Sequence, residues 1–189
     1  MVRSRDGDEL AFEELVRACE RRVVTIAYQI TGNLHDAQDV AQESFLSVYR
    51  ARDRFQDGRS FEAWLYRIVV NQARKSLARS RRLRTDALDD ETAAAIPAEG
   101  TPSPLEAAAA ESQSAALMRL LERLSPRLRS VFVLRDLQGM ETSEIARILS
   151  CAEATVRRHS AEARIRLRRL MEEQGRPAVM PATRREPSR

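Results

Sequence analysis

Apolar residues recur every three or four positions along most of the chain, which is the period of an α-helix. This period predicts a first helix over residues 8–30, ended by the left-handed-tolerant pair Gly32-Asn33. A second helix is predicted over 34–51 and a third over 61–82, the third capped by Ser60. The stripe of the second helix consists of Ala37, Ala41, Phe45 and Val48.

The same period returns in the last third of the chain. It predicts helices over 113–124, 127–138, 142–149 and 153–173, with Ser125-Pro126 as a helix start and Gly139 as a stop. For the helix over 142–149, Glu141 and Thr142 are both candidate N-caps. No segment predicts a strand, so the expected fold class is all-α.

Composition separates the two helical parts of the chain. Residues 85–112 hold three prolines, one glycine and a run of acids, a mixture that cannot bury a core of its own. We therefore predict two small helical domains, 1–84 and 116–175, joined by a flexible acidic linker over 85–115, with a disordered tail over 176–189. Residues 85–118 carry seven carboxylates and no basic side chain, whereas the regions on both sides are net basic. Such basic regions favour nucleic acid as a partner, although solvated helix faces also explain them.

Several classes of protein are disfavoured by what the sequence lacks. It has no P-loop, no GxSxG and no HExxH motif, and its two cysteines and two histidines have no metal-ligand spacing. We expect no cofactor, no metal and no enzymatic activity. The N-terminal residues do not resemble a signal peptide and no apolar run reaches the length of a membrane span, so we expect a cytoplasmic protein.

The segment "EIARILSCAEATVRRHSAEAR", 144–164, has the proportions of a helix-turn-helix. On a helical wheel, the packing face of its second helix consists of Val156, Ala163, Leu167 and Leu170. Ser160 falls beside Val156, where its hydroxyl could bond back to the Val156 carbonyl. Arg158 and Glu162 lie on the opposite side, where they could contact base edges in a major groove. An amphipathic hairpin with a basic outer face is the simpler alternative.

Two blocks of sequence resemble an extracytoplasmic-function (ECF) sigma factor of bacterial RNA polymerase. The first is "DAQDVAQESFLSVYRARDRF" followed by "SFEAWLYRIVVNQARKSLARSRR". The second is "LSPRLRSVFVLRDLQGMETSEIARILSCAEATVRRHSAEARIRLRRL". The resemblance implies a first domain that binds core polymerase and the −10 element and a second that binds the −35 element. The linker would thread the RNA channel of the polymerase, although a simple tether explains its composition equally well.

The resemblance implies that one face of the helix over 34–51 docks on the polymerase. That face consists of Asp36, Asp39, Gln42, Glu43 and Leu46. A leucine among carboxylates fits an apolar anchor with a polar rim. A solvated acidic face is the alternative.

The helix over 61–82 resembles the one that captures the melted −10 element. The residues implied in this role are Phe61, Trp64, Arg67, Asn71, Lys75 and Arg79. Trp64, Arg67, Asn71 and Lys75 share one face, and an aromatic ring beside cations suits unstacked bases. A pocket for a flipped base would lie between the loop over 56–60 and Phe61. Trp64 could instead be an ordinary core residue.

The helix-turn-helix would read the −35 element. The residues implied are Thr155, Arg157, Arg158, Glu162, Arg164 and Arg168, of which Arg164 and Arg168 could hold phosphates. The sequence departs from the family at Ser150, where glycine is usual, and at Glu162, which is often basic. Cys151 could sense oxidation or be a structural thiol.

The implied partners are the β and β′ subunits of core RNA polymerase, promoter DNA and an anti-sigma factor. The alternative functions are a sigma-like mimic and a stand-alone helix-turn-helix regulator.

Overall fold

The computed structural model of the chain describes residues 8–56, 58–86 and 114–173, and all regular structure in these ranges is helical. The elements are α2 (Glu9–Thr31), α3 (Leu34–Arg50), the 3₁₀ turn η1 (Arg52–Arg54), α4 (Phe61–Asp86), a helix over 114–122, α6 (Pro126–Phe132), the π-helical turn η2 (Val133–Leu137), α7 (Thr142–Leu149) and α8 (Glu153–Glu173). The all-α prediction is confirmed. Most of the predicted linker and the whole predicted tail lie outside the described residues.

Local capping explains most helix boundaries. The side chains of Asn33, Ser60 and Ser125 accept backbone N–H groups of the first turns of α3, α4 and α6. Gly32 ends α2 with a φ of 85°, and its N–H donates to the Tyr28 carbonyl. Since these signals are local, the predicted ends of α2 and α3 are met within one residue, whereas α4 continues to Asp86, beyond the predicted 82.

The first module, α2 with α3 and α4, is a three-helix unit with an apolar interior. Its core is built by Val23, Ile26, Ala27, Ile30, Ala37, Val40, Ala41, Val48, Leu65, Tyr66, Val69, Val70 and Ala73. Tyr66 is 1% exposed, and the Arg22 guanidinium lies 5.4 Å from the centre of its ring. Burial raises the pKa of Tyr66 to about 12, against an opposing effect of Arg22.

The second module comprises the helix over 114–122, α6, η2, α7 and α8. The prediction of a continuous α-helix over 127–138 is wrong for the second half of this range. After Phe132 the backbone widens into the π turn, in which the N–H of Gln138 donates to the Val133 carbonyl at 2.9 Å. Each hydrogen-bonded turn of a π-helix contains one residue more than a turn of an α-helix, so the predicted α-helix does not continue regularly past Phe132.

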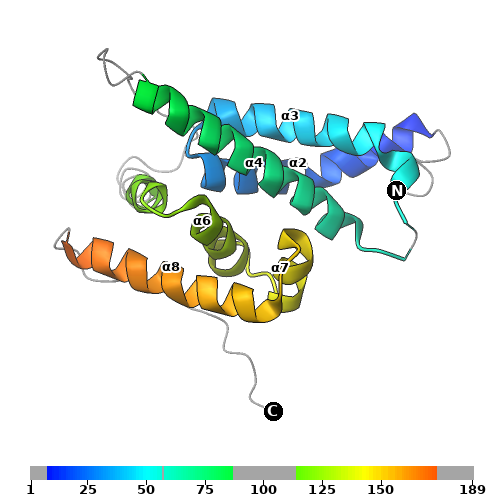
Figure 1. The fold of residues 1–189 in the computed structure, drawn as a ribbon. Helices are drawn as coiled ribbons and strands as arrows, with labels where there is room; N and C mark the ends of the chain where they lie inside the picture. The colour runs from blue at the N-terminus through cyan, green and yellow to red at the C-terminus, as the bar shows by residue number, and fades with distance from the viewer. Residues whose placement is uncertain (1–7, 57, 87–113, 174–189) are drawn as a thin grey trace, which may run out of the picture.

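The two modules pack against each other, a contact that the sequence did not predict. Figure 1 shows α2, α3 and α4 grouped together, with α6 and α7 between this group and α8. Arg129 of α6 is fully buried, and its Nε donates to the Gln29 carbonyl of α2 at 2.8 Å. Gln138 donates to the Gln29 amide oxygen at 2.9 Å, and Arg74 of α4 donates to the Ser130 hydroxyl at 2.9 Å. We call this contact the module seam.

Within residues 8–56, 58–86 and 114–173, no helix is both long and apolar enough to cross a membrane.

Candidate nucleic-acid and polymerase interfaces

The outer face of α3 is a groove wall with an apolar centre. Ala37, Val40, Ala41, Ser44 and Val48 are buried, so the opposite side of the helix faces solvent. Asp39, Gln42, Glu43 and Leu46 are exposed there and line a groove whose other wall is formed by Gln72, Lys75, Ser76 and Arg79 of α4. Leu46 is 41% exposed. An acidic wall with an apolar contact thus faces a basic wall across one groove.

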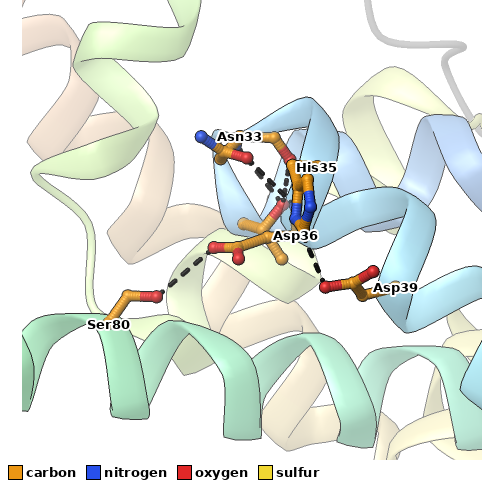
Figure 2. Close-up of polar contacts among 6 residues, drawn as sticks. Asn33, His35, Asp36, Asp39 and Ser80 are labelled. Atoms are coloured by element: carbon orange, nitrogen blue, oxygen red, sulfur yellow. Dashed lines mark hydrogen bonds and ion pairs between the residues drawn. The ribbon is translucent and has the colours of Figure 1, made fainter. Parts of the chain in front are cut away.

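Asp36 differs from the other four residues of the predicted docking face. It is half-buried, and Ser80 of α4 donates to its Oδ2 at 3.3 Å. Its backbone N–H donates to the capping side chain of Asn33 at 3.0 Å, and the neighbouring His35 lies 3.3 Å from Asp39 (Figure 2). Asp36 therefore joins α3 to α4, and the exposed residues of the predicted docking face are Asp39, Gln42, Glu43 and Leu46.

The start of α4 holds an aromatic cluster. The ring of Phe55 lies 5.4 Å from that of Trp64 and 6.0 Å from that of Phe61, and the Phe61 and Trp64 rings are 6.1 Å apart. All three side chains are half-buried. Phe55, Trp64, the flanking loop and Arg67 line a hollow at this position. Trp64 thus packs against neighbours and still borders an open hollow, which combines the two interpretations of this residue that the sequence allowed.

Phe55 is the member of this cluster that the sequence reasoning missed. It precedes the polar loop, and the helical period that identified Trp64 does not extend to it. The rest of the predicted α4 face is exposed, namely Arg67, Asn71, Lys75 and Arg79. These four side chains continue from the aromatic hollow along α4 as a polar, largely basic strip.

Arg67 takes part in the module seam. Its guanidinium donates to the carbonyls of Arg147 and Ile148, the latter at 3.3 Å. Both carbonyls belong to the last turn of α7, where the negative end of the helix dipole attracts a cation. A residue expected to contact DNA is therefore bound to the other module in this structure.

The helix-turn-helix is formed by α7, a three-residue turn and α8. Glu141 precedes α7 as the N-cap without a side-chain cap bond, which settles the choice between Glu141 and Thr142. Ser150 ends α7 with φ 52° and ψ 49°, the left-handed region in which glycine is favoured. The N–H of Cys151 donates to the Ala146 carbonyl at 3.0 Å, and α8 begins at Glu153.

The wheel predicted for α8 is confirmed. Val156, Ser160, Ala163, Leu167 and Leu170 are buried. Arg157, Arg158, Glu162 and Arg168 are exposed, and Thr155 is half-buried at the first turn. The expected bond from Ser160 to the Val156 carbonyl is absent, because the Ser160 hydroxyl has no hydrogen-bond partner among the described residues.

Arg164 is not free on the outer face. Its guanidinium is bound to the carboxylate of Asp136 in η2, with Nε at 2.8 Å and Nη2 at 2.6 Å from Oδ1. The side chain of Asp136 is 2% exposed and that of Arg164 is 32% exposed. Arg157 also has an acidic neighbour, Glu153 at 3.2 Å, but that pair lies on the surface.

These features define a class of protein: a two-module helical DNA-binding protein with a helix-turn-helix in its second module. Residues 15–83 match the family model of sigma-70 region 2, and residues 114–167 match that of sigma-70 region 4.

Similar proteins agree with both matches. The chain is 36% identical to the ECF RNA polymerase sigma factor SigE of Mycolicibacterium smegmatis over 86% of its own length, and it spans 63% of that longer protein. It is 31% identical to the RNA polymerase sigma-H factor of Pseudomonas aeruginosa, with 84% of each chain covered. The solved structure of CnrH in complex with the cytosolic domain of CnrY matches with a TM-score of 0.69 at 27% identity, over 91% of this chain and 94% of that one. The chain belongs to the ECF sigma factors.

Proposed function

We propose that this chain binds core RNA polymerase and directs promoter recognition, DNA melting and transcription initiation. The observation that carries the proposal is the combination, in one chain, of an exposed helix-turn-helix with a second helical module of matching family. A stand-alone helix-turn-helix regulator would not need the aromatic hollow of α4 or the groove beside α3.

The groove beside α3 is the proposed contact with the polymerase. Asp39, Gln42, Glu43 and Leu46 form its exposed wall. A solvent-exposed leucine surrounded by polar groups supplies buried apolar area on docking, and the carboxylates supply orientation through complementary charge. Asp36 accepts a hydrogen bond from Ser80 and thereby holds the helix that carries this face against α4.

The strip along α4 is the proposed contact with the −10 element. The hollow beside Trp64 can accept a base that has left the duplex, because an aromatic ring can stack on any base. Arg67, Asn71, Lys75 and Arg79 follow at helical spacing and would hold the backbone of the separated strand.

The exposed face of α8 is the proposed contact with the −35 element. Arg158 can donate to guanine in the major groove, and Glu162 can accept from cytosine. Arg157, Arg168 and the first-turn residue Thr155 lie beside them and can contact the sugar-phosphate backbone.

The remaining parts of the proposal follow from this activity. The chain acts by binding, without covalent chemistry of its own, in the cytoplasm where polymerase and chromosome meet. An anti-sigma factor is the proposed regulator; the similar protein CnrH was solved together with the cytosolic domain of CnrY.

Reconstitution tests the proposal directly. The purified chain is mixed with core RNA polymerase and a genomic library, and transcript starts are sequenced. The expected result is a set of start sites that share upstream elements and are absent with core enzyme alone. A chain that fails to comigrate with core enzyme and yields no start sites would refute the proposed function. A chain that binds an anti-sigma factor but yields no start sites would support the sigma-like mimic.

A further inference from the structure

The π turn η2 connects to both helices of the helix-turn-helix through two consecutive side chains. Arg135 donates to the hydroxyl of Thr142, the first residue of α7. Asp136 accepts a hydrogen bond from Nε of Arg164, near the middle of α8, and forms an ion pair with Nη2 of the same guanidinium. Two neighbouring side chains of one short turn thus contact the start of α7 and the centre of α8.

The Asp136–Arg164 pair is buried at one end and open at the other. Burial raises the pKa of Asp136, whereas its hydrogen bond to Arg164 and the charges of Arg164 and Arg135 act in the opposite direction. Both donor atoms of Arg164 reach the same oxygen, and the other carboxylate oxygen is buried without a hydrogen-bond partner among the described residues. Buried pairs of this kind add little net stability, and their best-attested role is to fix one geometry among several.

The apolar stripe of α8 sets which face of the helix is buried, and directional bonds add to that constraint. Val156, Ala163 and Leu167 pack through contacts without direction. The hydrogen bond from Arg164 to Asp136 is directional and charge-assisted. Arg164 follows Arg158 by six residues, about 9 Å along the helix axis at 1.5 Å per residue, and it lies two residues beyond Glu162. The pair therefore anchors α8 close to the segment that carries the candidate base-reading side chains.

We propose that Asp136 is a positioning residue for −35 recognition. It binds Arg164 and so orients α8, and Arg164 does not contact DNA phosphate. The pair sets the rotation of α8 so that Arg158 and Glu162 meet the base edges. This inference rests on the proposed function, and it replaces the phosphate contact that the sequence suggested for Arg164.

The test compares Asp136→Asn, Arg164→Met and their double variant with Arg168→Met. Arg168 is exposed on the same helix and is the matched control for a phosphate contact. Each chain is assembled with core polymerase and bound to a promoter duplex recovered by start-site mapping. A second duplex carries the same promoter with its −35 element scrambled. Affinity for both is measured over a series of salt concentrations, below the melting temperature of every variant.

We expect Arg168→Met to weaken binding to both duplexes equally and to reduce the slope of log affinity against log salt concentration by about 1. Arg164→Met keeps the wild-type slope but lowers discrimination between the two duplexes by about tenfold, within the range of one misplaced base contact. Asp136→Asn lowers discrimination by a similar factor. The double variant loses no more than either single one, because both changes remove the same interaction.

Three results would overturn the proposal. One is a salt-dependence slope for Arg164→Met that is reduced as much as the slope for Arg168→Met. The second is undiminished discrimination by Asp136→Asn, which would leave the pair a purely structural role. The third is additive loss in the double variant. If Asp136→Asn fails to fold, the salt-dependence slope and the discrimination of Arg164→Met still distinguish a positioning role from a phosphate contact. A wild-type chain that does not discriminate between the duplexes refutes the proposed −35 function instead, so the two failures are distinguishable.

Discussion

The turn of the helix-turn-helix contains a strained residue whose replacement should stabilise the protein. Ser150 is the single residue other than glycine with a positive φ in the ranges 8–56, 58–86 and 114–173. Its side chain is exposed, and its backbone N–H donates to the Ala146 and Arg147 carbonyls whatever the side chain is. Ser150→Gly should therefore remove strain without removing a packing contact.

The expected gain follows from two opposing contributions. Left-handed backbone costs a residue with a Cβ about 1–2 kcal/mol, and glycine loses about 0.5–1 kcal/mol more conformational entropy on folding. The net stabilisation is about 0.5–1 kcal/mol, which corresponds to a rise in melting temperature of about 1–4 °C for a chain of this length. Ser150→Ala keeps the strain and should stay within a few tenths of a kcal/mol of wild type.

Thermal unfolding followed by circular dichroism measures this difference. The matched control is Ser47→Gly, the same substitution inside α3, where helical backbone makes glycine unfavourable by about 0.5 kcal/mol relative to serine. A Ser150→Gly chain that melts at or below the wild-type temperature would show that the turn is not strained at this position, and the energetic account of the turn would be wrong.

Three further predictions concern the first module. Leu46→Ala should weaken binding to core polymerase in a pull-down or fluorescence titration, whereas Leu34→Ala, an equally exposed leucine on α3 outside the groove, should not; equal effects would exclude the groove as the docking site. Trp64→Ala combined with Asn71→Ala should reduce open-complex formation, read by permanganate reactivity, more than closed-complex binding, and equal losses would contradict base capture. Since the folded pKa of Tyr66 lies above its unfolded value, its stabilising contribution is complete below pH 10 and is lost as pH rises toward 12. The loss is about 3 kcal/mol. Alkaline unfolding of Tyr66→Phe should lack this loss, and an unchanged pH profile would refute the assignment.

Much of the fold was predictable because the relevant signals are local. The caps Asn33, Ser60 and Ser125 and the stop at Gly32 lie within a few residues of the groups they bind. The faces of α3 and α8 follow from the helical period alone. The π turn was not predictable, because its residues also fit an α-helical wheel and its wider backbone is selected by tertiary contacts.

The long-range hydrogen bonds and ion pairs of the site were harder to predict from the sequence. Arg164 and Asp136 are 28 positions apart, and Arg67 lies 81 positions before Ile148. The helical wheel identifies which residues leave the apolar core, but it does not reveal that an arginine on the edge of that face reaches a carboxylate on another element. For this reason Asp36 and Arg164 were assigned to binding surfaces, although the structure uses both to join helices.

Arg67 has consequences for how the two modules can be arranged on a promoter. Elements named −10 and −35 are separated by roughly 25 base pairs, about 85 Å of B-form duplex. A protein that touches both at once must hold its two halves far apart, whereas here the guanidinium of Arg67 is occupied by the backbone at the end of α7. Simultaneous engagement of both elements would therefore require the loss of these bonds, and the arginine that it releases is one of the side chains expected to contact the unwound strand.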